Sequence, residues 1–155
     1  MTESVFVTRS EAETELLVKK MAQALFPGTF IALNGELGAG KTAFVRALAQ
    51  GMGIEQVSSP SFVIVQEYDA KLPLFHFDVY RLSDSGELYD IGFADYQARG
   101  GVICMEWPER VSDVLPEERL DVWIDGSGEQ ERTITFCAHG EKHAALLRPL
   151  TEKKA

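Results

Sequence analysis

Eight residues, Gly35-Glu-Leu-Gly-Ala-Gly-Lys-Thr42, constrain the fold of this chain more than any other segment. They match the pattern G-x-x-x-x-G-K-[ST] at every fixed position. The segment follows a continuous apolar run at residues 30–33, which is typical of a strand covered on both faces. It precedes apolar residues at helical spacing, namely Phe44, Val45, Leu48 and Met52. The order of strand, glycine-rich turn and helix predicts an α/β fold.

The same turn predicts a phosphate-binding site. Between a strand and a helix, successive backbone N–H groups and the helix N-terminus face a bound anion. We expect Lys41, at an exposed junction of loop and helix, to reach the β- and γ-phosphates, and the Thr42 hydroxyl to ligate Mg²⁺. The rest of the expected cradle is Glu36, Leu37, Gly38, Ala39 and Gly40. The alternative is a plain glycine-rich turn with a surface lysine.

The sequence favours ATP over GTP as the nucleotide. Guanine selectivity in GTPases depends on an N-K-x-D loop, and the only asparagine of this chain, Asn34, lies at the junction of strand and turn. This excludes the usual GTPase reading. Adenine pockets have no comparable short signature, so ATP follows by elimination.

Two acidic residues end apolar strands and are candidate catalytic groups. Glu106 closes the run at residues 101–106, where a Mg²⁺ ligand or a water-positioning acid is expected beside the phosphate-binding turn. The alternative is a glutamate that ends a strand in solvent. Asp78 closes a second run and is expected to hold a water of the Mg²⁺ shell or to align the attacking water.

Two further segments adjoin this expected site. His76 alternates with Phe75 and Phe77, so we expect its ring to pack in the sheet rather than to transfer protons. The alternation should leave His76, Asp78 and Tyr80 together on one face. The segment Ser58-Ser-Pro-Ser-Phe62 stands where a switch loop would sense the γ-phosphate, although an ordinary Ser/Pro turn would have the same composition.

Composition places the chain among globular proteins of one domain. Its 155 residues are 45% hydrophobic and 25% charged, which excludes disordered, collagen-like and disulfide-scaffold classes. We expect one domain at residues 1–150 and a charged tail at residues 151–155. A formal charge of −9 opposes binding to nucleic acid or anionic lipid. Without an export signal or a membrane-spanning run, and with two isolated cysteines, the chain is expected in the cytoplasm with buried thiols.

Apolar periodicity predicts helices and strands along the chain. One helix should begin at the capping-box pattern of Ser10 to Glu13 and end before Pro27, and a second should follow the glycine-rich turn. Few helical stretches are expected in the second half, which should be rich in strands. The expected strands are residues 5–7, 30–33, 62–65, 74–79, 102–105, 120–124 and 133–137.

Taken together, these blocks resemble the bacterial TsaE (YjeE) family over about residues 5 to 137. The resemblance rests on their order and spacing, and the second half carries the more specific blocks. Ser61 and Ala43 stand where the family more often has threonine. The matching blocks are Gly35-Glu-Leu-Gly-Ala-Gly-Lys-Thr42, Ser59-Pro-Ser-Phe62, Glu67-Tyr68, His76-Phe-Asp-Val-Tyr-Arg-Leu82, Glu87-Leu88 and Glu106-Trp-Pro-Glu-Arg110.

This resemblance implies a P-loop NTPase-like α/β fold of three layers with a central, mostly parallel sheet. It implies ATP and Mg²⁺ as cofactors, with Thr42 and Glu106 at the metal, and weak hydrolysis by the chain alone. The implied role is that of an accessory to the TsaB–TsaD pair, which makes threonylcarbamoyladenosine (t6A) in tRNA, with tRNA contacted only through the complex. By family position, Thr8, Glu11 and Arg132 are expected near the base and ribose, although they also fit helix caps and surface charge.

Two other classes of protein stay open at this stage. A small-molecule P-loop kinase would need an arginine-bearing lid and an acceptor pocket, and no arginine cluster stands between residues 82 and 120. A nucleotide-binding scaffold would use the bound nucleotide only to support its fold.

Overall fold

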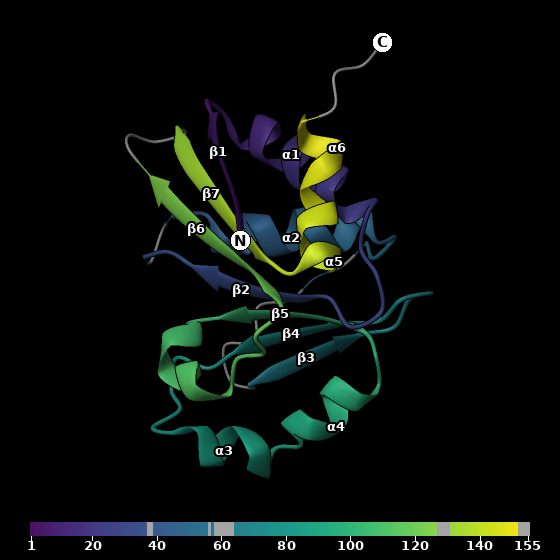
Figure 1. Ribbon diagram of the computed structural model, residues 1–155, viewed down its shortest axis with the longest axis vertical. Helices are drawn as coiled ribbons and strands as arrows, with labels where there is room; N and C mark the ends of the chain where they lie inside the picture. Colours follow the sequence, from purple (N-terminus) through teal and green to yellow (C-terminus); the bar gives the residue numbers. More distant parts are fainter. Residues whose placement is uncertain (37–38, 56, 58–63, 127–130, 152–155) are drawn as a thin grey trace.

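The computed structural model describes residues 1–36, 39–55, 57, 64–126 and 131–151, which form one seven-stranded sheet with helices on both faces (Figure 1). The strand order is β1-β7-β6-β2-β5-β4-β3. The strands are β1 (Thr2–Thr8), β2 (Phe30–Asn34), β3 (Val65–Tyr68), β4 (Leu74–Asp78), β5 (Val102–Glu106), β6 (Arg119–Gly126) and β7 (Arg132–His139).

The sheet is mixed, with a parallel centre. Strands β6, β2, β5 and β4 run parallel, while the pairs β6–β7, β7–β1 and β4–β3 are antiparallel. Two of the antiparallel pairs follow from short connections, because β3 and β4 are separated by five residues, 69–73, and β6 and β7 by five, 127–131. The predicted central parallel sheet is therefore confirmed for its four inner strands, and the outer strands make the whole sheet mixed.

Helices form a layer on each side of the sheet (Figure 1). The first layer contains α1 (Glu11–Ala22), α2 (Lys41–Gly51), α5 (Glu141–Ala144), η2 (Ala145–Leu147) and α6 (Arg148–Thr151). The second layer contains α3 (Ser85–Asp90), α4 (Phe93–Ala98) and η1 (Pro108–Val114). Sequence periodicity predicted α1 and α2 but none of the shorter helices of the second half, so the expectation of few helical stretches there was wrong. After β7, Leu146 and Leu147 of η2 are buried in the same core cluster as α1 and α2.

Alternation along β4 divides the core into two clusters. Leu74 belongs to the cluster under α1 and α2, whereas Phe75, Phe77 and Val79 belong to the cluster under α3 and α4. The Phe77 ring meets the rings of Phe93 and Tyr96 edge-on, with centroids 5.6 and 5.4 Å apart. The predicted alternation is thus confirmed, and even positions on β4 face the layer that contains α2.

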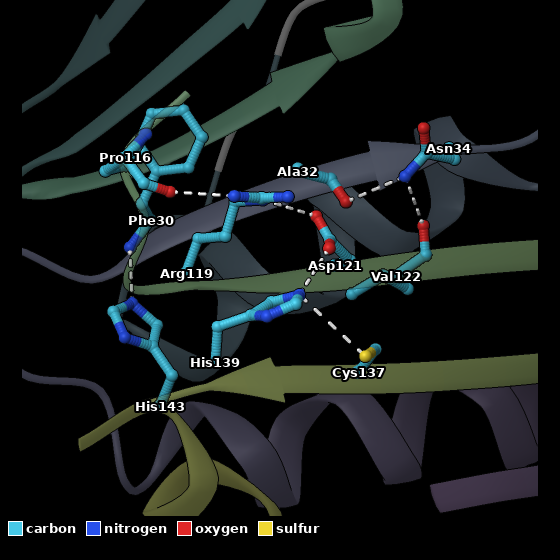
Figure 2. Close-up of polar contacts among 10 residues, drawn as sticks. All are labelled: Phe30, Ala32, Asn34, Pro116, Arg119, Asp121, Val122, Cys137, His139 and His143. Carbon is cyan, nitrogen blue, oxygen red and sulfur yellow. Dashed lines mark hydrogen bonds and ion pairs between the residues drawn. The ribbon is translucent and has the colours of Figure 1, made fainter. Parts of the chain in front are cut away.

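Hydrogen bonds hold β2 at both of its ends (Figure 2). At the start, the Phe30 backbone N–H donates to Nε2 of His143 on α5, at 3.1 Å. At the finish, the Asn34 amide donates to the carbonyl oxygens of Ala32 and Val122, each at 3.2 Å. The C-terminal helices and β6 therefore fix the strand that leads into the glycine-rich turn.

A second polar cluster lies at the start of β6 and the end of β7 (Figure 2). Asp121 accepts from Arg119 and from Nε2 of His139, both at 2.8 Å. The Cys137 thiol lies 3.8 Å from the same Nε2, and burial raises the pKa of this thiol and of Cys104. Because Nε2–H is committed to Asp121, His139 cannot take the thiol proton there. The prediction of two buried, unpaired thiols is confirmed.

Within the described part of the chain, no helix has the length and apolar character needed to cross a bilayer. Thr151 is the last residue of α6, and the rest of the expected charged tail lies outside the described residues.

Candidate phosphate-binding site at the carboxyl edge of the sheet

All seven strands have an end at the edge of the sheet where the glycine-rich turn begins. The parallel strands β2, β4, β5 and β6 end there, together with β1, while β7 and β3 begin there. In the strand register, Asp78 lies beside Glu106, and Glu106 lies beside Leu33 at the end of β2. The structure therefore brings both predicted carboxylates to the edge where the glycine-rich turn begins.

Gly35 and Gly40, at the two ends of the turn after β2, are both needed at their positions. A Cβ on Gly35 would lie 3.0 Å from the Ile124 carbonyl oxygen, so the turn packs closely on β6. Gly40 has a φ of 108°, a left-handed conformation that glycine adopts readily, and it caps α2. Between them, the Ala39 N–H donates to the Glu36 carbonyl oxygen at 3.0 Å. The two other expected cradle residues, Leu37 and Gly38, lie outside the described residues.

The N-terminus of α2 lacks the side-chain caps of its neighbours. Ser10 caps α1 by accepting from the Glu13 N–H, as the capping-box pattern predicted, and Asp84 caps α3. Gly40 offers no side chain, and the first turn of α2 contains no acidic residue. Backbone N–H groups at a helix start need acceptors, and the helix dipole favours anions there. This end of α2 is therefore suited to a phosphate group.

Lys41 is buried, which corrects the prediction of an exposed junction. Its side chain lies under Trp107, with Nζ 3.6 Å from the ring centroid, and only 6% of the residue is exposed. Burial lowers the pKa of Lys41, while the charges of Glu106, Glu109 and Asp78 oppose that shift. Within the described part of the chain, Nζ has no hydrogen-bond acceptor. A buried ammonium without an acceptor is costly, so an anionic ligand fits this position.

Glu106 is also buried, so the alternative of a solvent-exposed strand end is wrong. Its residue is 8% exposed, and Oε2 lies 2.6 Å from Nε2 of His76. The His76 ring packs in the sheet as predicted, at 3% exposure, but its hydrogen bond to Glu106 was not predicted. The strand assignments alone do not give this contact, because it depends on the register of β4 and β5, in which His76 lies beside Cys104 and Asp78 beside Glu106.

Asp78 and Trp107 complete the wall of the site beyond β4 and β5. Asp78 is partly buried, and its Oδ1 accepts from the Tyr80 N–H at 3.1 Å. Trp107 has a φ of 63°, and no other described non-glycine residue has a positive φ. Its ring contacts that of Tyr80 at a tilt of 54°, with centroids 4.8 Å apart, and the Arg110 guanidinium lies 5.0 Å from the Tyr80 ring centroid. Sequence reasoning missed Trp107, whose place over Lys41 depends on the turn after β5.

The residues expected near the base and ribose differ in their placement. Arg132 reaches the turn, because its Nε donates to the Ala39 carbonyl oxygen at 2.8 Å. Thr8 lies beside Arg132 in the β1–β7 register, but its hydroxyl is buried 2.6 Å from the Thr14 hydroxyl. Glu11 is exposed at the start of α1, and its side chain makes no hydrogen bond or ion pair with described residues. Of these three residues, Arg132 is the one that contacts the phosphate-binding turn directly.

Thr42 and residues 58–62 were predicted as a Mg²⁺ ligand and as a switch loop, respectively. Thr42 is exposed on the first turn of α2. The described residues hold no group of three or more His, Cys, Asp or Glu side chains arranged for a metal. Mg²⁺ is commonly held by one or two carboxylates together with phosphate oxygens and waters, so the donor set of Thr42 and Glu106 fits it when a nucleotide is bound. The expected switch segment, residues 58–62, lies outside the described residues.

Comparisons with known proteins agree along most of the chain. A family model for Threonylcarbamoyl adenosine biosynthesis protein TsaE matches residues 8–134. The tRNA threonylcarbamoyladenosine biosynthesis protein TsaE of Bacillus subtilis is 42% identical over 146 residues, covering 93% of this chain and 91% of that protein. The protein of the same name from Treponema pallidum is 38% identical over 132 residues, covering 84% and 98%. The crystal structure of Bacillus subtilis YdiB matches with a TM-score of 0.83 and 36% identity, covering 97% of this chain and 95% of that one. The chain therefore belongs to the TsaE family.

Proposed function

We propose that this chain binds ATP with Mg²⁺ at the carboxyl edge of its sheet and hydrolyses it to ADP and phosphate. The observation that carries the proposal is the buried Lys41 ammonium at the uncapped start of α2, which has no acceptor among the described residues. An anion of high charge would satisfy both the ammonium and the helix N–H groups. The G-x-x-x-x-G-K-[ST] pattern favours a nucleotide triphosphate as that anion.

The two carboxylates of the site are the reason for including a metal ion in the proposal. Asp78 and Glu106 lie side by side in the register, and both act electrostatically on Lys41. Two carboxylates next to a triphosphate repel it, so a cation between them is needed for tight binding. When bound there, Mg²⁺ would neutralise charge on the phosphate oxygens. Thr42 and Glu106 are the residues that would hold it.

Each residue of the site then has a distinct task. The backbone N–H groups of the turn bind phosphate oxygens, and Lys41 supplies charge at the β- and γ-phosphates. Arg132 supports the turn from β7 by donating to the Ala39 carbonyl oxygen. Asp78, held at Oδ1 by the Tyr80 N–H, orients the attacking water through its other oxygen. Trp107 covers Lys41 and limits the access of other water to it.

The biological role proposed for this activity is to reset the TsaB–TsaD pair between turnovers of t6A formation in tRNA. Membership in a family of tRNA threonylcarbamoyladenosine biosynthesis proteins supports the pathway. The acidic character of the chain, −9 in formal charge, supports contact with tRNA through the complex rather than directly. Its free buried thiols suit a reducing cytoplasm, where we place the reaction.

The test uses Asp78→Ala in a reconstituted reaction with TsaB, TsaD, threonylcarbamoyl-adenylate and tRNA. The variant should retain ATP and the partner complex but fail to release phosphate, so each complex should complete about one round of t6A formation. Multiple rounds at the wild-type rate, with normal phosphate release, would contradict the role of Asp78. Stimulation of ADP formation by a small-molecule acceptor, rather than by the two proteins, would favour a kinase instead.

A further inference from the structure

We propose that His76 is a positioning residue, which holds the Glu106 carboxylate away from Lys41 and so keeps that lysine available for phosphate. The inference rests on the proposed function, because it assigns Lys41 and Glu106 to the nucleotide and its metal. It extends that function to a residue that touches neither the nucleotide nor the metal.

The strand register carries the geometry. On the parallel strands β4 and β5, His76 lies beside Cys104, and Asp78 lies beside Glu106. Cys104 belongs to the core cluster on the α2 side, so its even-numbered neighbours share that face of the sheet. The His76 ring thus lies on the same face of the sheet as Glu106 and is 3% exposed. Its Nε2 lies 2.6 Å from Oε2 of Glu106. The ring is too deeply buried to meet a nucleotide itself.

The hydrogen bond has a defined direction. An ionised carboxylate only accepts hydrogen bonds, so Nε2–H is the donor and the Glu106 carboxylate is the acceptor. Nδ1 is buried and has no partner among the described residues. The His76 ring is therefore held at this position by its packing and by the single bond to Glu106.

The state of Lys41 indicates what this bond does. Glu106 attracts the Lys41 ammonium, yet Nζ makes no hydrogen bond with the described residues and rests on the Trp107 ring. The carboxylate is committed to His76 instead. Without His76, Glu106 gains the freedom to turn and pair with Lys41. That pair would neutralise the lysine and remove the carboxylate from the metal at the same time.

Two variants of His76 separate positioning from packing. His76→Gln keeps an amide N–H that can reach Glu106, whereas His76→Leu fills the space without a donor. Groups that orient a metal-binding residue typically contribute about 10- to 100-fold to metal affinity or activity. We expect His76→Leu to lose phosphate release and Mg²⁺-dependent ATP affinity by that factor, and His76→Gln to recover most of both. Leu74→Met is the matched control, since Leu74 lies on the same face of β4 but belongs to the apolar core.

A measurement without nucleotide keeps the inference testable if the leucine variant fails to fold. In ¹⁵N spectra of histidine-labelled wild type, Nε2 of His76 should carry a hydrogen-bonded proton. An Nε2 without a proton, a leucine variant equal to wild type, or a glutamine variant no better than leucine would overturn the inference. If wild type releases no phosphate even with TsaB and TsaD, the proposed function fails, while the spectra still report on the bond.

Discussion

His143 provides a stability prediction that the structure allows to be worked out in detail. It lies on α5, is 3% exposed, and accepts the Phe30 N–H through Nε2 at the start of β2. Its ring also meets the Phe26 ring edge-on, with centroids 4.9 Å apart. His143→Phe should keep the ring contact and remove the acceptor, so the variant isolates the hydrogen bond that anchors the strand before the phosphate-binding turn.

The expected loss follows from the unpaired N–H. A buried donor left without an acceptor costs about 1–3 kcal/mol. In a domain of 155 residues, each kcal/mol lowers the melting temperature by about 2–4 °C. The free energy of unfolding of His143→Phe at pH 8 should therefore fall by about 1–3 kcal/mol, with a melting temperature about 2–12 °C below that of wild type.

The loss should also depend on pH, with a definite sign. Burial lowers the pKa of His143, Glu118 opposes the shift, and His139 and Lys142 add to it. Because the folded pKa lies below the unfolded value of about 6.5, the unfolded chain binds the extra proton first. The stabilisation is fully present above about pH 6.5 and declines as the pH falls toward the folded pKa. Its slope cannot exceed about 1.4 kcal/mol per pH unit for one proton.

Urea unfolding of wild type and His143→Phe between pH 8 and pH 5.5 tests this reasoning. The difference in unfolding free energy between the two proteins should be largest at pH 8 and should shrink as the pH falls. Titrations elsewhere in the chain affect both proteins and cancel in the difference. A difference that stays constant with pH, or a variant as stable as wild type at pH 8, would refute the assignment of His143 as a neutral acceptor.

Three further outcomes are expected. Lys41→Ala should abolish phosphate release, while its unfolding free energy changes by about 2 kcal/mol or less, because the lost contact with the Trp107 ring is offset by the removal of a buried ammonium that has no acceptor among the described residues; release at the wild-type rate would exclude Lys41 from the site. Glu106→Ala should lower Mg²⁺-dependent hydrolysis much more than metal-free nucleotide binding, and equal losses would mark Glu106 as structural. Gly51→Ala should reduce stability by about 1–3 kcal/mol, measured by urea unfolding, because its Cβ would lie 2.6 Å from that of Ala22; an unchanged midpoint would show that α1 and α2 pack more loosely.

The sequence was most informative where local pattern determines structure. A continuous apolar run and a glycine-rich turn were enough to predict β2, the turn and α2, because these features act over neighbouring residues. The alternation of β4 likewise predicted which face carries His76. The segments after β7 were not predicted, because their helices are four residues or fewer and have too few turns to show a periodicity.

The chemistry of the site depended on contacts that no local pattern contains. Lys41 is buried because Trp107, 66 residues away in the chain, turns back over it in a left-handed conformation. The bond between His76 and Glu106 requires the register of two parallel strands that are separated by α3 and α4. Motif reading could name most of these residues, but it could not say that they are buried or which of them pair.

Phosphate release from ATP is the most direct test of the central claim that the carboxyl edge of this sheet is an ATP-hydrolysing site. Purified wild type with Mg²⁺ would be assayed alone and after addition of TsaB and TsaD, with a thermal shift by ATP measured in parallel. We predict slow release by the chain alone and faster release with the two proteins. A thermal shift by ATP without any release, even with both proteins present, would contradict the claim and leave a scaffold that uses the nucleotide only to support its fold.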